Sequence, residues 1–171
     1  MNVADKFYIK MTGQKSGAIK GGVTQKGRED SIAGLAMSWS VESPRNAQSG
    51  LPTGGVVHKP LAFTKAWDKS TPVLQNVMFT NENLSECVFT FWSSVSSTGT
   101  AASGVRVEAV AMTIKLVNAN IASYQAYTAS PDQLNQFDAS ELEDISLTYE
   151  SITWTWANGS ITSTGDWETR T

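Results

Sequence analysis

The sequence has one cysteine, Cys87, and one histidine, His58. A single cysteine excludes an intramolecular disulfide and a zinc site built from cysteines, and we expect Cys87 to be a buried thiol in a strand. A Cys-His or Ser-His-Asp catalytic site would have to use His58, which follows a glycine-rich stretch and lies close to Pro60. A histidine in a loop or at a strand edge is the simpler interpretation. We therefore predict that the chain is not an enzyme.

Long apolar runs are also missing. No run of 18 apolar residues is present, and the first residues lack the charged, apolar and small-residue regions of a secretory signal peptide. We expect a soluble chain that is made in the cytoplasm. The net charge of −3 and the pI of about 5.1 argue against nucleic-acid binding, which needs a dominant positive field.

Charge is unevenly distributed along the chain. Residues 1–28 hold six Lys or Arg and one acid, whereas residues 129–171 hold eight acids and one Arg. Two interpretations remain open: two solvated segments, or charge complementarity between neighbouring copies.

Motifs for ions and phosphates are absent. The glycines near residue 20 lack the phosphate-loop order of glycine, lysine and hydroxyl residue. The acids Asp138, Glu141, Glu143 and Asp144 do not have the spacing of a calcium loop, so we interpret them as a solvated loop. No metal and no cofactor is predicted.

Hydroxyl residues and period-two alternation, by contrast, are abundant. Twenty serines and eighteen threonines favour strands and turns over helix interiors. Apolar residues alternate in segments near residues 7–12, 31–41, 61–65, 87–91, 110–116, 121–127, 145–149 and 152–156. Asn158-Gly159 indicates a type I′ hairpin turn after the last of these.

One segment has helical spacing instead. Ser70-Thr71-Pro72 supplies a cap and a first-turn proline, and an apolar stripe follows at Val73, Leu74, Val77 and Met78. We predict a helix over residues 71–80. The expected fold is mainly β: a β-barrel of two packed antiparallel sheets with one α-helix against its side, in a single domain over residues 1–171.

Two long polar stretches interrupt the strands. Residues 42–60 carry three prolines and three glycines, too long for a tight hairpin, which makes residues 42–59 either a functional excursion or a floppy surface loop. Residues 129–144 form a second, charged loop that we expect to be exposed.

Several segments together resemble the Hcp family, the hemolysin-coregulated proteins of the bacterial type VI secretion system. They are SIAGLAMSWSVESP, SGLPTGGVVHKPLAFTKAWDKSTPVLQ, MTIKLVNANI and ISLTYESITWTWANG closing at GDW, with HKPLAFTKAWDKSTP the most specific. The Ser/Ala-rich segment 93–104 is longer than the usual turn of the family. The resemblance spans nearly the whole chain.

The resemblance implies a phage tail-tube-like subunit. Six copies would close into a ring, and rings would stack into the inner tube, which a contractile sheath expels with a spike protein at its tip and small effectors in its lumen. The protein would assemble in the cytoplasm and then leave the cell without a signal peptide. From the residues themselves we expect no nucleic-acid partner, because the chain is acidic, and no membrane insertion, because long apolar runs are missing. We also expect no fused toxin domain after GDWETRT.

By the same analogy the long loop would reach the adjacent ring. The predicted stacking residues are Asn46, Gln48, Ser49, Gly50, Leu51, Pro52, Thr53, Gly54 and Gly55. The alternative is a monomeric β-barrel that binds a glycan or another ligand, because the sequence has six tryptophans. Trp39, Trp92, Trp154 and Trp156 lie in alternating strand patterns, however, where core packing or subunit contact is the more common role.

Overall fold

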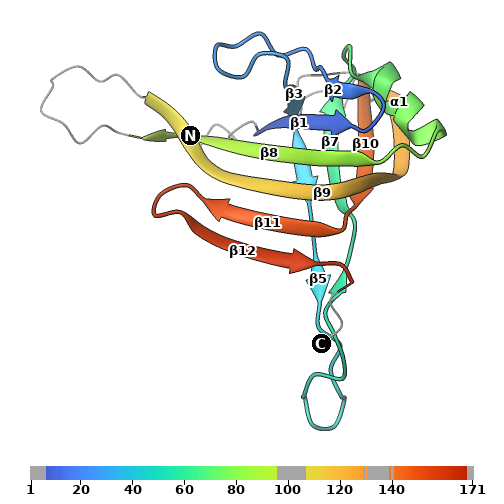
Figure 1. The fold of residues 1–171 in the computed structure, drawn as a ribbon, viewed down its shortest axis with the longest axis vertical. Coiled ribbons are helices and arrows are strands. Elements are labelled where there is room, and N and C mark those ends of the chain that lie inside the picture. Colours follow the sequence, from blue (N-terminus) through green and yellow to red (C-terminus); the bar gives the residue numbers. More distant parts are fainter. Residues whose placement is uncertain (1–6, 96–106, 129, 131–138, 140, 169–171) are drawn as a thin grey trace, which may run out of the picture.

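The computed structural model describes residues 7–95, 107–128, 130, 139 and 141–168. Their strands and single helix are shown in Figure 1. In chain order the elements are β1 (Phe7–Gly13), β2 (Gly17–Ile19), β3 (Ile32–Gly34), β4 (Ala36–Ser38), β5 (Val41–Glu42), β6 (Val57–His58), β7 (Leu61–Ala66), α1 (Thr71–Phe79), β8 (Leu84–Val95), β9 (Val107–Thr128), β10 (Glu141–Thr148), β11 (Ser151–Trp156) and β12 (Ile161–Asp166).

Two antiparallel sheets share the long strand β9. In the first sheet, β1 pairs with β2, β3 and β8, β8 pairs with β9, and β11 lies between β9 and β12. In the second sheet, β10 lies between the far half of β9 and β7, and β4 pairs with the other side of β7. The predicted mainly β class, two packed antiparallel sheets with one helix, is confirmed.

The core lies between the two sheets and is filled from alternating positions. Along β1 the side chains of Phe7, Ile9 and Met11 are buried while those between them are not, as the period of two requires. The same alternation holds along β7, and Cys87 is fully buried in β8 as predicted. Burial raises the pKa of the Cys87 thiol and makes it unreactive.

The helix α1 packs Leu74 and Val77 into the core and begins with Pro72 in its first turn, as the spacing predicts. The predicted cap is wrong in detail. Ser70 occupies the N-cap position, but its side chain makes no capping bond and donates instead to Asp68. Within the described residues no helix is long and apolar enough to cross a bilayer.

The strand predicted over residues 31–41 is broken into β3, β4 and β5. The segment leaves β1 at Gly34 and joins β7, so the chain passes from the first sheet to the second. At Gly34 the backbone passes very close to the ring of Phe7, and a Cβ there would lie 2.0 Å from that ring. Only glycine, which has no side chain, fits at this point. The strands predicted near residues 110–116 and 121–127 are one continuous strand, β9. Asn118 lies between them with a positive φ of 49°.

The loop predicted over residues 129–144 is wrong at its end, because residues 141–144 begin β10. Glu143 was predicted to lie in an exposed loop but is fully buried. Its buried carboxylate is compensated by the ammonium of Lys65 at 2.5 Å. Thr64 donates a hydrogen bond to Asp144. Asp138 and most of the predicted loop lie outside the described residues, as does most of segment 93–104.

The alternating segments predicted near residues 145–149 and 152–156 form the separate strands β10 and β11. Tyr149 and Ile152 are both buried because the chain breaks between β10 and β11 and passes from the second sheet back to the first. The β11–β12 hairpin forms, but not with a type I′ turn. That turn needs positive φ at Asn158 and Gly159, whereas the positive values occur at Gly159 and Ser160.

Candidate functional site

The segment predicted to stack subunits forms a narrow hairpin that leaves the body of the domain (Figure 1). β5 and β6 pair at its base, and an isolated bridge between Arg45 and Pro52 continues the pairing outward. Between them the amide of Thr53 donates to the carbonyl of Pro44 at 3.0 Å. The segment is therefore an ordered ribbon, and the interpretation as a floppy loop is wrong.

Asn46 organises the tip of this hairpin. Its side-chain oxygen accepts hydrogen bonds from the amides of Gln48 and Ser49 at 2.9 and 3.0 Å, an Asx turn. The amide of Gly50 donates to the carbonyl of Asn46, and Gly50 has a φ of 70°, which favours glycine. The tip is thus built from the residue types that its backbone requires.

The hairpin carries few charges and several exposed apolar side chains among its polar residues. Leu51 is 65% exposed, and Val41, Val56 and Val57 are also exposed. Among residues 43–56 the only charged side chain is Arg45. Nothing lies within 4 Å of a Cβ placed on Gly50 or Gly54, so the backbone there is open to another surface. The nine predicted residues thus lie on this ribbon: Asn46, Gln48, Ser49, Gly50, Leu51, Pro52, Thr53, Gly54 and Gly55.

A cluster of four side chains, Trp39, His58, Tyr149 and Trp167, holds the base of the hairpin; we call it the aromatic root. The Tyr149 hydroxyl accepts from the indole N–H of Trp39 at 2.6 Å and lies 3.0 Å from Nδ1 of His58. The ring of Trp167 packs edge-on against Tyr149, with centroids 5.0 Å apart, and lies 5.8 Å from the ring of His58. Burial raises the pKa of Tyr149, although the Trp39 hydrogen bond acts in the opposite direction.

The sequence gives no sign of this aromatic root, because its members come from four separate parts of the chain. His58 is a strand-edge histidine that serves in packing. The rings of Trp39 and Trp154 lie 5.3 Å apart, so these two tryptophans pack on each other and are not a free shelf for a sugar.

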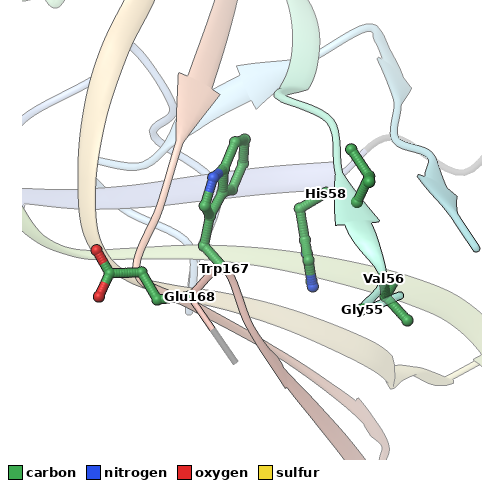
Figure 2. A pocket seen from close by; sticks show the side chains of 6 residues that line it. Gly55, Val56, His58, Trp167 and Glu168 are labelled. Carbon is green, nitrogen blue, oxygen red and sulfur yellow. The ribbon is translucent and has the colours of Figure 1, made fainter. Parts of the chain in front are cut away.

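A cleft lies beside the aromatic root. It has a volume of about 690 Å³ and lies between the hairpin and the segment that follows β12. Figure 2 shows the rings of His58 and Trp167 and the side chain of Glu168 at this cleft. Across residues 7–95, 107–128 and 141–168, no three His, Cys, Asp or Glu side chains are placed to hold a metal ion.

The family model for Hcp, described as a type VI secretion system effector, matches residues 8–156. The chain belongs to the Hcp family. A curated relative, the major exported protein of Pseudomonas aeruginosa, is 31% identical over 174 residues, which cover 96% of each chain. The Hcp family is a family of structural type VI secretion proteins, not of enzymes.

Solved Hcp structures have the same fold. A doubly substituted Hcp1 from E. coli EAEC 042 aligns with a TM-score of 0.79 at 27% identity, over 96% of this chain and 99% of that one. The secreted protein Hcp3 from Pseudomonas aeruginosa aligns with a TM-score of 0.76 at 24% identity, over 97% and 100% of the two chains. The likeness to Hcp3 concerns the fold alone.

Proposed function

We propose that this Hcp-family chain is a structural subunit of a type VI secretion inner tube, in which six copies close into a ring and rings stack through the hairpin of residues 41–58. The observation that carries the proposal is the hairpin itself. It is ordered by its own hydrogen bonds, held by the aromatic root, and exposes the apolar side chain of Leu51 near its tip. A rigid projecting ribbon loses little entropy when it docks on a second surface.

Ring closure needs a heterologous contact, one face of a subunit against a different face of the next. Among the described strands, β12 at one edge of the first sheet pairs with β11 alone, and β4 at one edge of the second sheet pairs with β7 alone. Open edges of this kind promote aggregation in a monomer and are covered in a closed ring. The sheet edges therefore favour assembly.

In this proposal the tube forms in the cytoplasm and is then expelled from the cell. A contractile sheath would surround it, a spike protein would sit at its tip, and small effectors would travel in its lumen. Killing activity would belong to that cargo.

The test is to shorten residues 46–55 while keeping the pairing of β5 with β6. The shortened chain should unfold at an unchanged urea concentration and still form rings, because these residues contribute no buried side chain to the core. Stacking of rings, seen by electron microscopy, and export should be lost.

Two point variants refine this test. Leu51→Ser removes an exposed apolar side chain from the hairpin and should reduce stacking. Ala47→Ser adds one hydroxyl to the exposed turn and should leave stacking intact. Normal stacking and export of the shortened chain would show that the hairpin is not the stacking element, and a strictly monomeric wild-type protein at high concentration would refute the ring.

A further inference from the structure

The core-facing side of the first sheet continues beyond the layer that covers it. Ile152 of β11 pairs with Leu116 of β9, and both side chains are buried. Two residues further along β11, Trp154 pairs with Ile114 and is only partly buried. The burial of side chains on this face therefore decreases from Ile152 to Trp154 along β11.

The last step of this series is exposed. Trp156 pairs with Met112 on one side and with Ile161 on the other, so the three side chains are neighbours on one face. Trp156 is 46% exposed and Ile161 is 67% exposed. We call Met112, Trp156 and Ile161 the apolar overhang.

Figure 1 shows the reason for this exposure. β8, β9, β11 and β12 extend away from α1, past the strands β7 and β10 of the second sheet. The sequence keeps the core alternation of residues 152, 154 and 156 to the end of β11. Adjacent exposed apolar side chains of this kind, more than single ones, mark surfaces that bind a partner.

The strand at the border of the apolar overhang is also unprotected. Within the part of the chain that the structure describes, β12 pairs with β11 alone, and its six residues include one charge, Asp166, but no proline, no lysine and no register shift. Soluble proteins normally use such features to prevent an edge strand from pairing with another chain. Both the apolar side chains and the strand edge are therefore available to a partner.

We propose that the apolar overhang is the lateral contact that closes the ring, and that a second copy of this chain covers it; this inference rests on the proposed function. The chain carries its own apolar counterpart. Phe79 is the last residue of α1 and is 80% exposed. The helix α1 lies at the opposite side of the molecule from the β11–β12 turn (Figure 1). The two surfaces cannot meet within one chain, but they can meet between successive copies.

The directions of the projections fit this arrangement. The turn between β11 and β12 and the helix α1 lie on opposite sides of the body, whereas the hairpin between β5 and β6 projects toward neither of them (Figure 1). A head-to-tail contact between those two sides leaves the hairpin free to reach a neighbouring ring.

The experiment compares ring formation across a concentration series by sedimentation. Trp156→Ser with Ile161→Thr should leave the monomer folded and raise the concentration at which half the chains are in rings by at least about tenfold. Phe79→Ser should have a similar effect. Leu51→Ser is the matched control, because it removes an exposed apolar residue from the hairpin and should leave ring closure unchanged.

A variant that combines the Trp156, Ile161 and Phe79 substitutions tests whether the apolar overhang of one copy touches Phe79 of the next. If they touch each other, the combined variant should be little worse than either alone, and additive effects would overturn the assignment of Phe79. Ile161→Glu provides a second variant on a solvent-facing side chain, whose fold can be checked by circular dichroism.

Rings of Ile161→Glu that form at the wild-type concentration would overturn the overhang contact. Failure of the wild-type chain to form rings under any condition would instead refute the proposed function. The two failures are therefore distinguishable.

Discussion

Replacement of Lys65 by methionine should destabilise the domain more than any surface change. The Lys65 ammonium is fully buried and lies 2.5 Å from Glu143, 3.0 Å from Asp68, 2.9 Å from the carbonyl of Ala66 and 3.2 Å from the hydroxyl of Thr71. Lys65→Met leaves the Glu143 carboxylate buried without a cation, a loss that typically costs about 3–5 kcal/mol. For a chain of 171 residues this corresponds to a fall in Tm of very roughly 6–20 °C.

The second half of the test removes the stranded charge. Glu143→Gln in the Lys65→Met background removes the charge and keeps one acceptor oxygen, for the hydroxyl of either Tyr124 or Thr71, so the double variant should recover at least about 2 kcal/mol of the loss. Urea unfolding followed by tryptophan fluorescence measures both variants. A loss below about 1 kcal/mol for Lys65→Met would mean that water reaches this site and would refute the reasoning.

Three further outcomes follow from local geometry. Gly34→Ala should lower the free energy of unfolding by about 1–3 kcal/mol, because the new Cβ would lie 2.0 Å from the Phe7 ring. Gly54→Ala is the control, since no atom lies within 4 Å of a Cβ there, and it should leave the free energy of unfolding unchanged. Equal effects of the two variants in urea unfolding would contradict the close packing at Gly34. Tyr149→Phe removes the hydroxyl of the aromatic root and should cost about 1–3 kcal/mol, with faster amide exchange at the hairpin base; unchanged exchange would show that the hydroxyl does not hold the hairpin. Burial raises the pKa of Asp68, but hydrogen bonds from Ser70 and the charge of Lys65 outweigh it and hold that pKa below its ordinary value of 3.8. The Asp68 carboxylate therefore stabilises the fold above about pH 4, and this stabilisation is lost as the pH falls through the pKa of the folded state. Asp68→Asn should reduce the slope of unfolding free energy against pH in this acidic range. An unchanged slope would show that Asp68 does not contribute to the acid sensitivity.

Local patterns predicted those elements whose side chains have one constant environment. The alternation of Phe7, Ile9 and Met11 and the apolar stripe of α1 each face one core, so the strand and the helix were predicted correctly. Where the chain passes between sheets, at Gly34 and again after Tyr149, its environment changes within a few residues. A single period cannot describe such a segment, which is why residues 31–41 were predicted as one strand.

Prediction also failed where a polar group is paired at a distance in the sequence. Glu143 belongs to an acidic stretch and therefore indicated solvent, yet its partner Lys65 lies on the neighbouring strand. The aromatic root has the same origin, since Trp39 and Tyr149 meet only in the folded chain. The stacking role of residues 46–55 remains a prediction, although the hairpin that carries them is ordered.

The shared strand β9 has a consequence for folding. Its 22 residues supply partners to β8 and β11 in one sheet and to β10 in the other, so neither sheet can be completed before β9 is in place. Domains in which most paired residues lie far apart in the sequence fold slowly, commonly in about milliseconds to seconds. Both sheets should therefore acquire amide protection in a single kinetic phase, with no intermediate in which one sheet is finished and the other is not.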